Sequence, residues 1–333
     1  MSDSSSQPHL IQVPKQFEFD GRPFPAVFDN QQSLTSLAAI AAWLQANQAL
    51  LERVLQESGA VLFRGFPIDN AVAFDRFSAA FGYPDFTYQE SLSNAVRVNL
   101  TDRVFTANEA PPEVEIFLHH EMAQTPVSPA KLFFHCHAAA QLGGATSLCR
   151  SDQLYALILD QMPQWARKFE EHGLRYTTLM PVDDNLASGQ GRSWKSTLSV
   201  TDRAGAESQL QGLGYSWQWQ PDDSLQVTTP VLPAVVDLGD GRKAFYNQLI
   251  AAYMGWAGVK ANPAASLVLG DGTTIPISVF EKLVSMANTL TFDLNWQDGD
   301  IALIDNRITM HGRRAYSGDR RRQVWVALAA ARA

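Results

Sequence analysis

Histidines are the residues in this chain most able to support chemistry, and there are seven of them. Two candidate ligands lie in the segment Phe117-Leu-His-His-Glu-Met122, where His119 and Glu121 are two positions apart. On a β-strand such residues project from one face, so both could bind one ion while His120 points away. An imidazole and a carboxylate on one face are two thirds of the facial triad that binds non-haem iron. A His-x-Glu triplet also arises often by chance, and the alternative is an exposed or hydrogen-bonded pair.

A third candidate ligand lies near the C-terminus. The turn Gly299-Asp300 leads into an apolar strand, Asp305-Asn306 closes that strand, and His311 opens the next one. His311 is the only histidine in the last third of the chain, which makes it the natural third ligand. The alternative is a core or surface histidine with no metal.

A basic run, Asp319-Arg-Arg-Arg322, leads directly into the apolar segment 323–329. Charge runs are usually solvated, but the continuity with an apolar strand indicates that at least one guanidinium points inward. A buried arginine needs an anion, and its planar fork suits a carboxylate. A dicarboxylate cosubstrate would supply one.

The sequence His135-Cys-His137 is a rival metal site, because its two imidazoles would also share a strand face. Metal-binding cupins follow such a pair within a few residues by a glutamate, whereas this chain continues with Ala-Ala-Ala-Gln-Leu-Gly-Gly. We therefore expect His135 and His137 to have core or supporting roles.

The elements that must position these residues are mostly short strands. Apolar residues at helical spacing predict a helix from about Ser33 to Leu55 that stops at Gly59, and a shorter helix runs from Phe74 to Phe81. Further helices are expected near 152–171 and 279–287. Strands are expected at 60–64, 114–118, 131–135, 225–230, 244–246 and 324–328. Many short strands without a βαβ rhythm predict an antiparallel sandwich or barrel decorated by helices.

Bulk composition narrows the class of protein. The 333 residues have no evident repeat or linker, so we expect a single domain over 13–333 after a disordered polar segment at 1–12. A net charge of -8 argues against a nucleic-acid binder. No apolar run approaches the length of a membrane span, no signal peptide is evident, and two cysteines do not make a disulfide framework. These features indicate a soluble, cytoplasmic protein.

Taken together, the motifs resemble the TauD/TfdA-type 2-oxoglutarate oxygenases, and within them the clavaminate-synthase-like, SyrP-like group. The resemblance runs from about Gly59 to the C-terminus, and its specificity lies in the order and spacing of the motifs. They are Gly59-Ala-Val-Leu-Phe-Arg-Gly-Phe66, Leu118-His-His-Glu-Met122, Leu142-Gly-Gly-Ala-Thr146, Arg192-Ser-Trp194, Phe245-Tyr-Asn247, Trp296-Gln-Asp-Gly-Asp300, Asp305-Asn306 and His311-Gly-Arg313.

The resemblance implies a mainly β fold with flanking helices, a double-stranded β-helix (jelly-roll) core with Fe(II) at its open end. It implies that His119, Glu121 and His311 are both the metal ligands and the catalytic residues. It further implies that 2-oxoglutarate and O2 are cosubstrates, with Thr146 and Arg322 on the 2-oxoglutarate carboxylates. Arg320 is the second choice, because on a strand it would share a face with Arg322.

Two departures from the family pattern concern the substrate. The position between the first two ligands is commonly Asn in the SyrP-like group but is His120 here. The second arginine that taurine-type members carry four places after the first is missing, which disfavours a sulfonate substrate. Relatives that halogenate replace the carboxylate ligand by a small residue, so the retained Glu121 predicts hydroxylation, or else desaturation or cyclisation.

The resemblance implies an amino-acid-like small molecule as substrate, either free or tethered to a carrier protein, in secondary metabolism. Residues near the implied site that could contact it are His120, Asn99, Phe105, Asn108 and Asn247, for which loop hydrogen bonding or packing is the alternative. Two other functions stay open from the sequence. One is a Zn-dependent hydrolase with the same three ligands, and the other is a catalytically silent jelly-roll that binds a ligand or protein.

Overall fold

Two β-sheets form the centre of the molecule in a computed structural model that describes residues 7–86, 92, 97–108, 110–184 and 191–330. Seven strands make the larger sheet, in the order β1 (His9–Ile11), β4 (Ala26–Asp29), β5 (Ala60–Arg64), β18 (Ile301–Asp305), β8 (Lys131–Ala138), β21 (Gln323–Ala329) and β6 (Val104–Thr106). The smaller sheet has the order β17 (Thr291–Leu294), β10 (Thr146–Arg150), β19 (Thr309–Arg313) and β7 (Ile116–His119). Apart from the parallel pair β4–β5, neighbouring strands in both sheets are antiparallel.

The two sheets pack face to face, and the period-two alternation of each strand decides what reaches the interior. Leu148 on β10 packs in one buried cluster with Phe134 on β8 and Val326 on β21. Cys149, the next residue along β10, packs instead in a separate cluster outside the sandwich. By the same alternation, Met310 on β19 points outward and His311 points inward. The centroids of the His311 and Phe134 rings are 5.2 Å apart.

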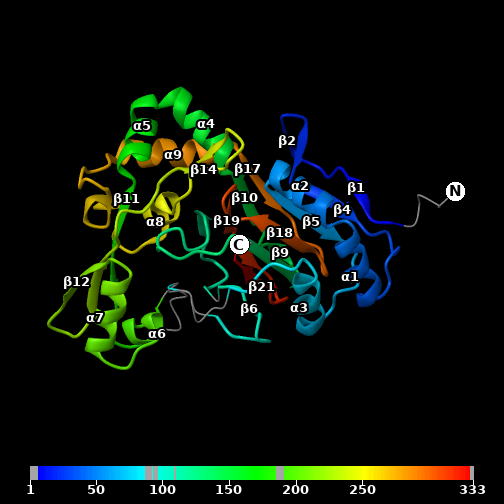
Figure 1. Cartoon of the computed structure of the whole chain (residues 1–333), viewed down its shortest axis with the longest axis horizontal. Coiled ribbons are helices and arrows are strands. Elements are labelled where there is room, and N and C mark those ends of the chain that lie inside the picture. The colour runs from blue at the N-terminus through cyan, green and yellow to red at the C-terminus, as the bar shows by residue number, and fades with distance from the viewer. Residues whose placement is uncertain (1–6, 87–91, 93–96, 109, 185–190, 331–333) are drawn as a thin grey trace.

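Helices cover the outer face of each sheet (Figure 1). On the larger sheet they are α1 (Leu37–Ala46), α2 (Gln48–Ser58) and α3 (Ala71–Ala79), which share a buried cluster with the outward residues of β5, β8 and β18. On the smaller sheet they are α4 (Ser151–Gln161), α5 (Pro163–His172), α8 (Leu249–Gly255) and α9 (Ile277–Thr289). None of the helices in the described part of the chain has the length and apolarity needed to cross a membrane.

A third sheet extends from the sandwich as a lobe (Figure 1). Its strands are β12 (Ser216–Trp219), β13 (Leu225–Thr228), β11 (Leu174–Met180) and β16 (Leu267–Leu269), accompanied by α6 (Trp194–Leu198) and α7 (Arg203–Gly212). Short two-stranded ribbons pair β2 (Phe17–Phe19) with β3 (Arg22–Phe24), β14 (Val236–Asp237) with β15 (Lys243–Ala244), and β9 (Leu142–Gly143) with β20 (Tyr316–Ser317). A 3-10 turn occupies Pro263–Ala265.

The expected sandwich with flanking helices is confirmed, with local differences that have physical causes. The long N-terminal helix is broken at Asn47, whose backbone leaves the helical region (φ -107°, ψ 13°) and ends α1 before α2 begins. Gly59 ends α2 as expected, in the left-handed conformation that glycine tolerates (φ 80°). A Cβ at that position would lie 2.5 Å from Thr309 Oγ1, so the close approach also requires glycine.

The expectation of a disordered segment at 1–12 is wrong for residues 9–11. His9–Ile11 pair with Ala26–Asp29 as the edge strand β1, and Ile11 packs against the buried cluster of the sandwich, so backbone hydrogen bonds and an apolar contact together order this segment. Residues 1–6 lie outside the described part of the chain.

Candidate active site

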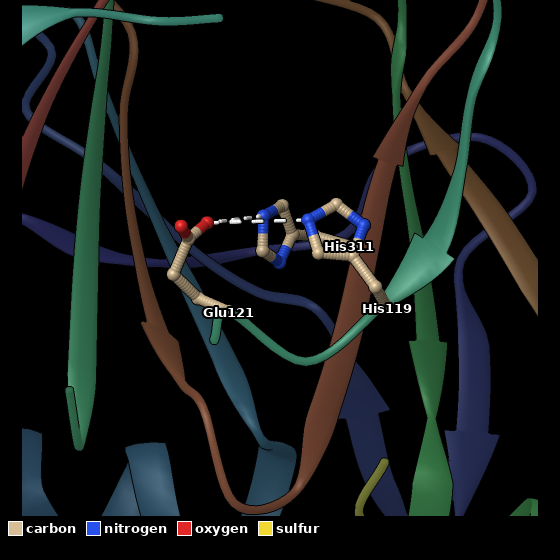
Figure 2. Close-up of side chains that lie close together, drawn as sticks. All are labelled: His119, Glu121 and His311. Atoms are coloured by element: carbon tan, nitrogen blue, oxygen red, sulfur yellow. Dashed lines mark ion pairs between the residues drawn. The ribbon is translucent and has the colours of Figure 1, made fainter. Parts of the chain in front are cut away.

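Three side chains converge at one end of the sandwich. One nitrogen from each of His119 and His311 and one carboxylate oxygen of Glu121 all lie within 4.8 Å of one another. Glu121 Oε2 lies 3.4 Å from His311 Nε2 and 3.9 Å from His119 Nε2 (Figure 2). No other such group of three or more His, Cys, Asp or Glu side chains is found in the described part of the chain.

The two histidines come from neighbouring strands. His119 is the last residue of β7 and lies directly opposite His311 in the middle of β19, with their ring centroids 4.3 Å apart. The Nδ1 of His119 is 2.8 Å from the Phe117 carbonyl oxygen, and a carbonyl can only accept. Nδ1 therefore carries the proton, and the lone pair of Nε2 faces Glu121, ready to bind a metal.

Glu121 is placed in the site by a turn, which strand alternation did not predict. Strand β7 ends at His119, and Glu121 lies in the turn beyond it, so the shared strand face expected for the two residues is wrong. The side chain of Asn306 fixes this turn, since its Oδ1 accepts from the Glu121 backbone N–H (2.8 Å) and its Nδ2 donates to the Glu121 carbonyl oxygen (3.0 Å). Asn306 Nδ2 also donates to the Pro129 carbonyl (2.8 Å).

The protonation states of these groups suit a divalent cation. Burial, together with the neighbouring His311, lowers the pKa of His119 to about 4, so its imidazole is neutral at neutral pH. Burial alone would raise the pKa of Glu121, but Arg97 and a hydrogen bond from His311 hold that pKa well below its usual range. Two imidazoles and a buried carboxylate that lacks its own proton are the donor set of a facial-triad iron site, so the residues present fit this metal.

A cavity of about 370 Å³ extends from this cluster into the sandwich. Thr146 and Arg322 line it together with the three side chains above. Thr146 Oγ1 accepts hydrogen bonds from Trp296 Nε1 (2.9 Å) and from Arg322 Nη2 (3.4 Å), while Arg322 Nε donates to the Gly144 carbonyl (2.8 Å). Burial, with Arg313 nearby, lowers the pKa of Arg322 to about 10, and the guanidinium stays charged at neutral pH. No carboxylate pairs with Arg322 among the described residues.

Arg320 does not share a strand face with Arg322, contrary to expectation. Strand β21 begins only at Gln323, and Arg320 lies in a bend before it, where alternation does not apply. The Arg320 guanidinium is half exposed and pairs with Asp298. It does not line the cavity, whereas Arg322 does.

The five residues considered as substrate contacts are placed differently from one another. Only Asn108 lines the cavity. His120 is fully buried with Nδ1 toward the Asn306 carbonyl, Asn247 is buried with its amide on Ala234, and Phe105 packs in the sandwich core. Asn99 is exposed on the segment that pairs with Phe105. His120, Asn247 and Phe105 are thus placed in packing or hydrogen bonding, and Asn99 does not line the cavity.

Residues that the sequence did not single out also line or support the site. Arg97 lines the cavity and forms an ion pair with Glu121. Gln124, Gln248 and Trp256 line it as well, from the turn after β7 and from the region of α8. The rival pair has the supporting role expected for it: the His135 ring packs between Phe74 and Trp325, and His137 stacks on Trp325.

The fold and this site define the class of protein, a mononuclear non-haem Fe(II)- and 2-oxoglutarate-dependent dioxygenase on a jelly-roll core. The family model "Taurine catabolism dioxygenase TauD, TfdA family" matches residues 21–328, and the chain belongs to this family. A Zn-dependent hydrolase and a silent binding protein, the two alternatives that the sequence leaves open, are disfavoured because the family is one of dioxygenases.

Relatives and solved structures agree with this assignment. A clavaminate synthase-like protein of Arabidopsis thaliana is 35% identical over 315 residues, which are 93% of this chain and 95% of that protein. The dapdiamide synthesis protein DdaC of Enterobacter agglomerans is 27% identical over 282 residues, 81% of this chain and 82% of the relative. The crystal structure of an asparagine oxygenase in complex with Fe(II), 2S,3S-3-hydroxyasparagine and succinate has the same fold. Its TM-score is 0.52 at 12% identity, covering 88% of this chain and 83% of the other.

Proposed function

We propose that His119, Glu121 and His311 hold Fe(II), and that Thr146 and Arg322 hold the far carboxylate of 2-oxoglutarate. The observation that carries this assignment is that one cavity contains both sets of residues. A buried arginine without a carboxylate partner costs free energy unless an anion joins it, and a dicarboxylate whose other end reaches the metal supplies that anion. The iron, when bound, supplies activation of dioxygen and oxidative decarboxylation of the cosubstrate.

The protein's own part in the reaction is to orient groups and to exclude water. Phe134, Val324 and Val326 form an apolar part of the wall of this cavity. This wall keeps bulk solvent from the reacting atoms, and a low local dielectric strengthens the pairing of Arg322 with a carboxylate. Thr146 is itself held by Trp296, so its hydroxyl is oriented before any ligand arrives.

We further propose that the reaction is hydroxylation of an amino-acid-like small molecule, free or carrier-tethered, in secondary metabolism. The cavity wall offers the amides of Asn108, Gln124 and Gln248, which suit the polar ends of such a substrate. A relative in dapdiamide synthesis and a structural neighbour that is an asparagine oxygenase support the same substrate class.

One experiment tests the cosubstrate assignment. Under anaerobic conditions, Fe(II) and 2-oxoglutarate are added to the purified protein, and the weak visible charge-transfer band of the chelate is recorded. The band should appear, and its absence at full metal occupancy would reject the assignment.

The substrate class is tested separately, by screening amino acids and carrier-bound aminoacyl groups for succinate formation. Failure of every amino-acid-like compound would contradict the proposed substrate class.

The turn that presents Glu121 yields a first prediction. Asn306→Ala removes the amide that bonds both the N–H and the carbonyl of Glu121, so the carboxylate loses its fixed direction. We expect Fe(II) affinity to fall roughly 10- to 100-fold, as is common when a residue supporting a metal ligand is lost. Anaerobic metal titration measures this, and Asn295→Ala, an exposed amide, is the control. Equal affinity in Asn306→Ala and wild type would show that the turn holds without it.

The retained carboxylate yields a second prediction. Because Glu121 occupies the ligand position that halogenating relatives leave open, chloride has no place at the metal. Turnover in the presence of chloride should give hydroxylated product and no chlorinated product, measured by mass spectrometry of the product. A chlorinated product from the wild-type protein would contradict the hydroxylase assignment.

A further inference from the structure

The two carboxylate oxygens of Glu121 have different partners. Oε2 faces the histidines, 3.4 Å from His311 Nε2 (Figure 2). Oε1 points to the other side and accepts a hydrogen bond from Arg97 Nη2 at 2.9 Å. One oxygen is therefore directed at the position where a metal would lie, and the other is bound by a guanidinium.

Arg97 is held in place by the edge of the larger sheet. Residues 98–106 form a tight hairpin, in which Thr106 N–H donates to the Val98 carbonyl (2.9 Å) and Val98 N–H donates to Thr106 Oγ1 (3.0 Å). The second arm of this hairpin is β6, which pairs with β21, the strand that Arg322 precedes. The Arg97 guanidinium lies over the ring of Phe105, 5.1 Å from its centroid. Its position is thus set by the backbone and by a cation–π contact.

A contribution to folding stability alone does not explain this ion pair. The side chains of Arg97 and Glu121 are 7% and 6% exposed, so both charges have lost most of their hydration. Buried ion pairs commonly add little to folding, because desolvation offsets the attraction between the charges. A pair of this kind beside a candidate metal ligand indicates instead a role in fixing how that ligand binds the metal.

We propose that Arg97 is a positioning residue that keeps Glu121 a single-oxygen ligand. This inference rests on the proposed function of His119, Glu121 and His311. A carboxylate that bound through both oxygens would take a second position on the metal, and a facial triad works only because three positions stay open. By engaging Oε1 through a charge-assisted hydrogen bond, Arg97 leaves those positions for the cosubstrate and dioxygen.

The test compares Arg97→Met with Arg97→Lys and with wild type, using Co(II) alone as the probe under anaerobic conditions. Arg97→Met should change the shape and intensity of the Co(II) d–d bands, because the released carboxylate can take a second position. It should also raise Co(II) affinity about tenfold, because the second oxygen adds a bond to the metal and a neighbouring positive charge is removed. Arg97→Lys keeps a positive charge near Oε1 and should restore part of both properties.

A double-variant cycle separates this role from a merely structural one. In a Glu121→Ala background no carboxylate remains to be positioned, so adding Arg97→Met should leave the Co(II) d–d bands unchanged. Arg103→Met is the matched control, since Arg103 lies on the same hairpin but pairs with Asp75 and Asp85. It should bind Co(II) as wild type does.

Three outcomes would overturn the inference: wild-type spectrum and affinity in Arg97→Met, no recovery in Arg97→Lys, or an equal change of the d–d bands by Arg97→Met in the Glu121→Ala background. A failure of the proposed function looks different. The wild-type protein would then show no chelate band with Fe(II) and 2-oxoglutarate, whichever residue stands at position 97.

Discussion

Glu121→Ala is expected to lower substrate hydroxylation by more than about 100-fold. Loss of a group that merely supports a metal ligand costs roughly 10- to 100-fold, and loss of the ligand itself should cost at least as much. The substitution removes the only carboxylate of the three-residue cluster and leaves Arg97 without its partner at 2.9 Å. Succinate and hydroxylated product, measured together at saturating Fe(II), report the effect.

Two further variants, one at the same position and one at a nearby exposed acid, test whether the lost activity is due to the carboxylate of Glu121. Glu121→Gln keeps the size of the side chain but not its charge, and it should lose nearly as much activity, because the metal needs the anion. Glu113→Ala removes an exposed acid eight residues earlier and should leave turnover unchanged. If Glu121→Ala retained wild-type turnover, Glu121 could not be a ligand, and the cluster would need another carboxylate.

The fold was largely predictable because its strands are short, apolar and separated by turn signals. The strand at Ala60–Arg64 begins and ends where the sequence indicated, bounded by Gly59 and Gly65. The break at Asn47 could not be read from periodicity, because apolar residues continue at helical spacing on both sides of it. The edge strand at His9–Ile11 was missed for a related reason, since its order comes from backbone pairing with a distant segment.

The candidate site was predictable where residue type and chain position carried the signal. His119, Glu121 and His311 were identified by pattern and family resemblance, and the structure brings them together. The geometric reason given for Glu121 was wrong, since the turn beyond β7 and the side chain of Asn306 place it, and strand alternation does not.

Arg97 could not be found from the sequence by the same means. It lies 24 residues before Glu121, in no motif, and meets it only because the β6 hairpin folds back along the edge of the larger sheet. The available signal was a single arginine between Val96 and Val98, and such residues are common on protein surfaces.

Arg322→Gln is expected to raise the KM for 2-oxoglutarate on the order of 100-fold. Truncating one partner of a buried, hydrogen-bonded charge pair costs about 2–5 kcal/mol, and each 1.4 kcal/mol is tenfold in affinity. The Arg322 guanidinium is largely buried and is oriented by the Gly144 carbonyl and Thr146, so a carboxylate bound to the variant would lose both the charge and the geometry of this partner. Steady-state kinetics with varied 2-oxoglutarate measure the change.

The register of the basic run and the role of Arg322 can be decided by the same experiment. Arg320→Gln should leave the KM unchanged, because Arg320 lies in the bend before β21 and pairs with Asp298 at the surface.

A 2-oxo acid without the far carboxylate, such as 2-oxobutyrate, has no group that Arg322 could bind. Wild type should therefore strongly prefer 2-oxoglutarate over 2-oxobutyrate, and Arg322→Gln should lose most of this preference while still using both. A variant that lost activity with both compounds equally would indicate a damaged fold, whereas one that kept the preference would show that another cation binds the far carboxylate.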